Sequence, residues 1–112
     1  MKFKITKENL LKGIQTIYPV VPSRSTLPIL SHILLEAKKD ILQLTATDLE
    51  MGITTQAAAE VAEEGAIAVP AKRLNDLIKE LPSEMLQISS KKNQQITVEC
   101  GRGLFKIMGL AK

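Results

Sequence analysis

The chain has 112 residues, 45% of them hydrophobic, so we expect a single domain over residues 1–112 with a substantial core. Fifteen basic residues oppose twelve acidic ones, and the net charge of +3 is only a mild bias toward anionic partners. Three aromatic residues and no tryptophan exclude a base-stacking platform for single-stranded nucleic acid. No apolar run approaches the roughly 18 residues of a membrane helix and no signal peptide begins the chain, so we expect a cytoplasmic protein without a membrane partner.

The N-terminal segment predicts a strand followed by an amphipathic helix. Residues 2–5 alternate between lysine and apolar side chains, which is typical of a strand with one buried face. Thr6 is a suitable N-cap for a helix over residues 7–18, whose apolar side chains fall within roughly 120° of arc. Gly13 costs this helix about 1 kcal/mol relative to alanine, so we expect it to mark a close approach to a neighbouring element.

Residues 18–30 are predicted to form a loop, because three prolines interrupt both helix and strand. The apolar residues on either side would pin the loop, with Ser23, Arg24 and Ser25 at its tip. An arginine between hydroxyls suits a phosphate oxygen, since the guanidinium offers a fork of donors. The alternative is an ordinary exposed arginine on a connector.

The remainder of the chain repeats the strand and helix pattern of its beginning. Alternation predicts three strands after the loop, then a short strand, a second helix opened by Pro70, and three further strands. These segments span residues 33–38, 42–47, 53–61, 66–69, 70–81, 85–90, 94–100 and 104–110. The chain therefore reads as a duplicated β-α-β-β-β unit, which predicts an α+β fold with two helices packed on one side of antiparallel sheets.

Basic side chains lie opposite the apolar stripes of both predicted helices. Lys12 occupies this position on the first helix, together with Asn9 and Thr16. On the second helix Lys72, Asp76 and Lys79 lie opposite the stripe. Arg73 lies on its flank. The result is a helical surface of mixed but mainly basic charge, for which the alternative explanation is plain solvation.

Four separated motifs resemble one family. They are VVPSRSTLPIL at residues 20–30, LTATDLEM at 44–51, VPAK at 69–72 and CGRGLF at 100–105. In this order and spacing they resemble the N-terminal domain of the bacterial DNA polymerase III beta subunit, the replicative sliding clamp. The resemblance implies the DNA-clamp fold and a ring of two subunits with three such domains each, whose helices line a hole around duplex DNA. This chain would then be the first domain of a processivity factor, a non-catalytic subunit of a DNA polymerase holoenzyme.

The resemblance also implies binding residues and partners. The family's loop at Ser23 to Thr26 contributes a DNA contact, which assigns DNA binding to Arg24 with Ser23 and Ser25. The resemblance also places four basic residues on the helix faces that line the hole, and so assigns DNA binding to Lys12, Lys72, Arg73 and Lys79. We expect sequence-independent contact with duplex DNA, weak for this domain alone. The polymerase and the clamp loader would bind through a pocket between the family's second and third domains, outside this chain.

The last predicted strand, residues 104–110, is apolar on both faces. Phe105 and Ile107 share one face, and Leu104, Met108 and Leu110 share the other. A strand of this kind requires a cover on each side. In the family the corresponding strand joins the third domain of the other subunit, so the resemblance assigns Phe105 and Ile107 to the subunit interface, on an edge that is exposed here.

Catalytic motifs are missing from the sequence, so we expect no enzyme activity, no cofactor and no metal. Asp48 and Glu50 could form a carboxylate pair, but two acids at a strand end more often cap a turn. Cys100 has alternating apolar neighbours and reads as a buried thiol rather than a nucleophile. The competing function is a small protein-interaction module that pairs through an exposed strand edge and never contacts DNA.

Overall fold

The computed structural model describes residues 1–21, 32–48, 51–82, 84–91, 93–101 and 103–110. Its elements, in chain order, are β1 (Lys2–Thr6), α1 (Lys7–Ile17), the 3₁₀ turn η1 (Tyr18–Val20), β2 (His32–Lys38), β3 (Ile41–Thr47), β4 (Gly52–Ala58), β5 (Glu60–Glu63), β6 (Gly65–Pro70), α2 (Ala71–Glu80), β7 (Met85–Ser90), β8 (Gln95–Cys100) and β9 (Gly103–Met108).

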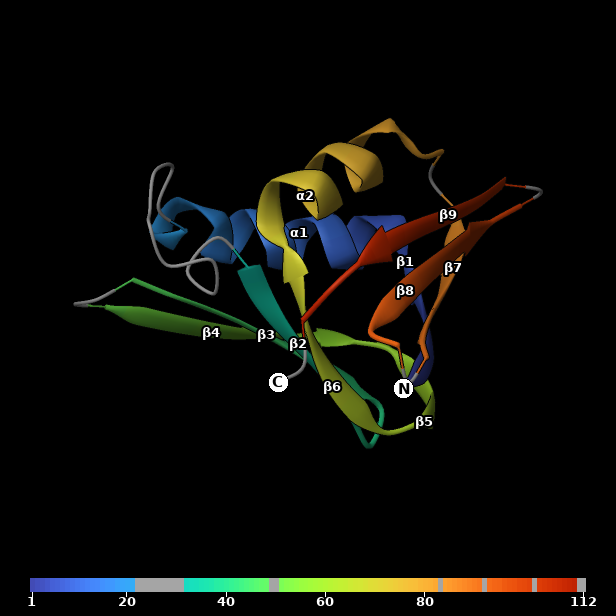
Figure 1. The fold of residues 1–112 in the computed structure, drawn as a ribbon, viewed down its shortest axis with the longest axis horizontal. Helices are drawn as coiled ribbons and strands as arrows, with labels where there is room; N and C mark the ends of the chain where they lie inside the picture. The colour runs from blue at the N-terminus through green and yellow to red at the C-terminus, as the bar shows by residue number, and fades with distance from the viewer. Residues whose placement is uncertain (22–31, 49–50, 83, 92, 102, 111–112) are drawn as a thin grey trace.

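The strands form two antiparallel sheets that exchange their first strands. One sheet has the order β5-β1-β7-β8-β9 and the other has the order β4-β3-β2-β6. Strand β1 begins the first half of the chain but pairs with β7 of the second half, while β6 begins the second half and pairs with β2. Both helices lie on the same side of the sheets and run in opposite directions (Figure 1). The predicted duplication and α+β fold are confirmed.

Helix α1 begins at a side-chain cap and lies close to the four-stranded sheet. The Thr6 hydroxyl accepts a hydrogen bond from the Asn9 backbone nitrogen at 3.1 Å, as expected for an N-cap. Gly13 is buried, and a Cβ atom at this position would lie 3.0 Å from Leu44 Cδ1 on β3. Glycine therefore lets the helix approach the sheet, which confirms the expectation drawn from its place in the sequence.

The end of α2 is held by the beginning of α1. The Lys7 ammonium donates to the Lys79 carbonyl oxygen at 3.1 Å and also to that of Leu81. These carbonyls would otherwise lack partners at the helix C-terminus. A positive charge at this end is also stabilising, because it lies near the negative end of the helix dipole. The Lys7 side chain thus holds the N-terminus of α1 beside the C-terminus of α2, and the exposed faces of the two helices lie next to each other.

Residues 53–61 do not form the single strand that alternation predicts. The run is divided at Ala59 into β4, at the edge of the four-stranded sheet, and β5, which pairs with β1 in the other sheet. The Ala59 backbone nitrogen donates to the Asp40 carbonyl oxygen at 3.4 Å, which attaches the crossing to the β2–β3 turn. Ala57 and Val61 both pack against the core, so the period of two continues through the crossing and conceals it.

The last described residues make an equivalent crossing in the second half. After β9, Leu110 pairs with Ala68 of β6 through hydrogen bonds of 3.0 and 2.8 Å. In each half, the segment after the last strand therefore pairs with the first strand of the same half. In the first half β5 pairs with β1, and in the second half Leu110 pairs with β6. The duplication extends one step further than the predicted β-α-β-β-β unit.

The inner faces of both sheets and the two helices share one hydrophobic core. Its largest fully buried side chains are Phe3, Ile5, Leu10, Ile14, Ile17, Ile33, Leu35, Leu42, Leu44, Ile67, Leu74 and Ile78. Each contributes about 1.5–3 kcal/mol by leaving water. Within the described ranges, no helix has the length and apolar character needed to cross a membrane.

Gly109 should be required for the crossing at Leu110. A Cβ atom on Gly109 would lie 2.5 Å from the Ala68 carbonyl oxygen, so Gly109→Ala must force the two segments apart. We expect it to lower the free energy of unfolding by about 1–3 kcal/mol, measured by urea denaturation with circular dichroism. Gly52→Ala is the matched control, because its nearest contact is a Thr47 methyl group at 3.3 Å. Equal stability of the two variants would contradict the tight closure.

Candidate nucleic-acid interface

Three of the predicted DNA contacts, Ser23, Arg24 and Ser25, lie outside the described residues. The described chain leads toward them through η1, where the Val21 backbone nitrogen donates to the Tyr18 carbonyl oxygen at 3.0 Å. Their contact with DNA stays a prediction that follows from the family resemblance.

The other four predicted contacts are exposed on the two neighbouring helices. They are Lys12 on α1 and Lys72, Arg73 and Lys79 on α2. Exposed carboxylates share the same helices, namely Glu8, Asp76 and Glu80. Four cations minus three anions leave a surplus of one positive charge on these exposed positions. We define this surface, with its seven charged residues, as the helical face. Its charge favours phosphate only weakly, which suits contact without a fixed position on DNA.

A hollow of about 240 Å³ borders the helical face between α1 and β4. Its described lining residues are Asn9, Lys12, Gly13, Thr16, Thr55, Gln56, Ala57 and Ala58. Lys12 is the charged member of this set. Lys12 could be predicted from the sequence but the β4 residues could not, because no sequence pattern places a helix beside a strand that comes several elements later.

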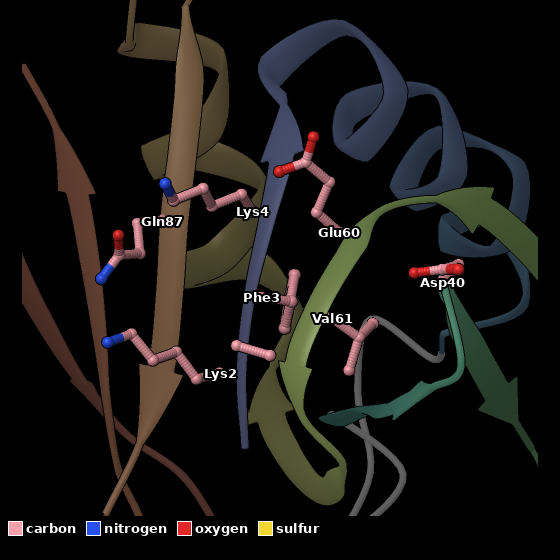
Figure 2. A pocket seen from close by; sticks show the side chains of 8 residues that line it. Lys2, Phe3, Lys4, Asp40, Glu60, Val61 and Gln87 are labelled. Carbon is pink, nitrogen blue, oxygen red and sulfur yellow. The ribbon is translucent and has the colours of Figure 1, made fainter.

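A second hollow of about 260 Å³ lies beside β1 and has a different charge. Lys2 and Lys4 come from β1, Glu60 comes from β5, and Asp40 comes from the β2–β3 turn (Figure 2). Gln87 of β7 lies opposite Lys4 in the sheet. Because the lining carries two ammonium groups and two carboxylates, this hollow offers no net attraction to an anion.

Strand β9 is an edge strand, but its two predicted interface residues differ in exposure. Phe105 is 37% exposed, whereas Ile107 is 9% exposed and belongs to the core of this domain. Ile107 pairs with the buried Ile96 of β8 and lies two residues closer than Phe105 to the crossing at Leu110. The expectation that Ile107 is exposed is therefore wrong. Leu104 and Met108, 54% and 57% exposed, dominate the outer face.

Asp48 stabilises a turn directly after β3. Its Oδ1 accepts a hydrogen bond from the Met51 backbone nitrogen at 2.6 Å, and its own backbone nitrogen donates to the Met51 carbonyl oxygen at 2.9 Å. This confirms the turn-capping interpretation of Asp48, while Glu50 lies outside the described residues. In the part of the chain that the structure describes, no three His, Cys, Asp or Glu residues gather as a metal site would require.

Cys100 is buried, as its neighbours predict. The thiol donates a hydrogen bond to Glu84 Oε2, with a sulfur–oxygen distance of 3.4 Å. Burial raises the pKa of the Cys100 thiol above its ordinary value, and the hydrogen bond and the negative charge of Glu84 raise it further, against the opposing charge of Lys7. A thiol held in its protonated form is a poor nucleophile.

The fold and the helical face place the chain in a structural class, that of sliding-clamp domains. A putative DNA polymerase III beta subunit from Eubacterium rectale superimposes with a TM-score of 0.95 and 33% identity, covering 99% of this chain and 30% of the solved one. A DNA polymerase sliding clamp from Caulobacter crescentus gives a TM-score of 0.94 and 34% identity, again over 99% of this chain and 30% of the other.

Sequence comparison identifies the family within this class. The family described as the N-terminal domain of the DNA polymerase III beta subunit matches residues 1–112. The beta sliding clamp of Pseudomonas aeruginosa is 40% identical over 111 residues, which is 98% of this chain and 30% of the relative. The clamp of Chlamydia pneumoniae is 37% identical over 112 residues, 100% of this chain and 31% of that relative. The chain belongs to the DNA polymerase III beta subunit family and spans about three tenths of the length of these two relatives.

The buried thiol should make stability depend on alkaline pH. Because the folded-state pKa of Cys100 is raised, the unfolded chain loses this proton first, at about pH 8.5. Above that pH the unfolded state binds fewer protons, so the free energy of unfolding should decrease until the folded thiol also ionises. Urea denaturation between about pH 7.5 and 9.5 should show a steeper decrease for the wild type than for Cys100→Ala. Identical slopes would contradict the raised pKa.

Proposed function

We propose that this chain is the first domain of a DNA polymerase processivity factor, a ring-forming sliding clamp that encircles duplex DNA. The family match over residues 1–112 carries the proposal. In the whole protein, a second clamp subunit would complete the ring, and the polymerase and clamp loader would bind elsewhere on it. The protein would work in the cytoplasm and without catalysis.

The helical face supports a sliding contact with DNA. A clamp must stay on DNA while moving along it, so its lining should attract phosphates without holding any base pair. A surplus of one positive charge over seven exposed charged residues fits this requirement better than a strongly basic groove would. Retention would then come from the closed ring and not from affinity. The family match favours this function over a protein-interaction module that never meets DNA.

Weak, salt-sensitive binding to duplex DNA tests this function. In fluorescence anisotropy with duplexes of different sequence, we expect low affinity, no sequence preference and weaker binding as salt rises. Lys72→Gln should reduce the slope of log affinity against log salt by roughly 0.9, since one phosphate contact is lost. Lys39→Gln removes the same charge from the exposed β2–β3 turn and should change nothing. An equal effect of both variants, or tight binding to one sequence, would contradict the proposal.

We also infer that the edge of β9 joins another clamp subunit. This strand is the outermost of its sheet among the described strands, so one side of its backbone is available for pairing. Its exposed apolar side chains continue along the strand and just beyond it. They are Leu104, Phe105, Met108 and Leu110. Ile107 would support this joint from the core without contacting the partner.

Substitutions on β9 should separate association from folding. We expect weak self-association of the chain at high concentration in analytical ultracentrifugation, and Phe105→Asp should reduce it, because association would bury the 37% of this side chain that is exposed. Ile107→Asp should instead destabilise the fold, by about 2–5 kcal/mol for the lost apolar burial alone. Thermal unfolding measures the second effect. A folded Ile107→Asp that no longer associates would overturn the assignment of Ile107 to the core.

A further inference from the structure

The hollow beside β1 lies on the outer face of the five-stranded sheet, on the side away from the core. Lys2 and Lys4 are exposed on this face, whereas Phe3 between them is buried, as alternation along a strand requires. Phe3 and its partner Val61 on β5 both pack their side chains against the core. They therefore line the hollow with their backbones, and its floor stays open because no long side chain rises from it.

A β-bulge lies within the floor of this hollow. The register between β1 and β5 changes between Lys2 and Phe3, which pair with Glu63 and Val61. Ala62 is the extra residue without a partner in this register, and it is exposed and lines the hollow. Bulges are frequent beside binding sites, because they interrupt the ladder of backbone hydrogen bonds and redirect a side chain. Here the bulge presents a small apolar side chain at the centre of a charged surface.

The charged groups around the hollow are separated by sign. Figure 2 shows the ammonium groups of Lys2 and Lys4 beside Gln87 of β7, and the carboxylates of Glu60 and Asp40 on the other side of β1. Lys4 and Glu60 are direct partners in the β1–β5 register, yet no ion pair joins them. Each sign of charge is thus available to a ligand on its own side of the hollow.

The size of the hollow favours one side chain of a peptide over a cofactor. Its volume of about 260 Å³ is below the roughly 300–1,000 Å³ typical of small-molecule pockets. The aliphatic stems of Lys2 and Lys4 form one wall, and the Ala62 methyl group adds apolar surface. A single apolar side chain therefore suits the centre, with a carboxylate on the lysine side and a cation on the carboxylate side.

The spacing of the strands defines the spacing of these three groups on the ligand. In the sheet β7 and β5 are two strands apart, which is about 10 Å, and Asp40 belongs to the turn beyond β5. Alternate residues of an extended peptide point to the same side and lie roughly 6.6 Å apart. A peptide that crosses the strands would therefore place an acidic residue at position i, an apolar residue at i+2 and a basic residue at i+4.

We propose that this hollow is a docking site for an extended segment of a partner protein with that acidic, apolar and basic order. The acidic side chain binds Lys2 and Lys4, the apolar side chain lies over Ala62, and the basic side chain binds Glu60 and Asp40. The inference goes beyond the proposed function and does not depend on it. The hollow faces away from the core that carries the helical face, so a protein bound here leaves that face open.

A titration of the ¹⁵N-labelled chain with the capped peptide acetyl-Asp-Ser-Leu-Ser-Lys-amide tests the docking site. We expect weak, saturable shifts of the amides of residues 2–4 and 60–63. Lys4→Gln and Asp40→Asn should each weaken binding by about two- to fivefold, because exposed ion pairs contribute little individually. Asparagine also tolerates the positive φ of 57° at Asp40, so the turn should keep its shape. Lys39→Gln and Glu64→Gln are the matched controls, since they remove exposed charges outside the lining.

A peptide of the same composition tests the spacing. In acetyl-Asp-Leu-Ser-Ser-Lys-amide the leucine points to the opposite side of an extended chain, so we expect weaker binding and smaller shifts at residues 60–63. Equal binding of the two peptides would reduce the contact to charge alone and overturn the proposal. Shifts confined to other surfaces, no shift at millimolar peptide, or equal losses in the control variants would overturn it as well.

Discussion

The exchange of first strands between the two sheets is the constraint on which the rest of this domain depends. Neither half of the chain can complete its sheet alone, because β1 pairs with β7 and β6 pairs with β2. The helices follow directly after these exchanged strands, so the exchange brings α1 and α2 together over one core. The Lys7 ammonium then joins the start of α1 to the end of α2. The helical face exists as one surface because of this arrangement.

If the proposed function holds, a face of this kind would let a protein remain on DNA without binding it tightly. Each exposed lysine or arginine contributes a weak attraction that salt reduces, and the carboxylates between them prevent strong accumulation of positive charge. A closed ring converts such weak contacts into persistent association, because leaving the DNA requires opening the ring and not merely breaking contacts. Under this proposal a mildly charged surface would suit sliding better than a highly basic one, and this chain has a net charge of only +3.

Local patterns were sufficient to predict most elements of the fold. The apolar stripe of α1, its Thr6 cap and the buried Gly13 all follow from spacing within a few residues. The alternation of β2, β3, β7 and β8 likewise reflects one buried face for each strand. Asp48 was interpretable as a turn residue for the same reason, since its hydrogen bond reaches only three positions along the chain. These features are local, so the sequence contains all the information they require.

By itself, the sequence determined the order of the elements, the duplicated pattern, the family resemblance and the exposed lysines of the two helices. Only the tertiary structure decided which strands pair across the halves, because any first strand with one apolar face satisfies the same alternation. It also showed that residues 53–61 are divided at Ala59 between the two sheets, although the period of two continues unbroken through this point. It also placed Ile107 in the core and Phe105 at the rim, although both occupy the same face of β9. The burial of a residue depends on the elements that pack against it. For β9 and for the α1–β4 hollow, those elements are distant in the chain.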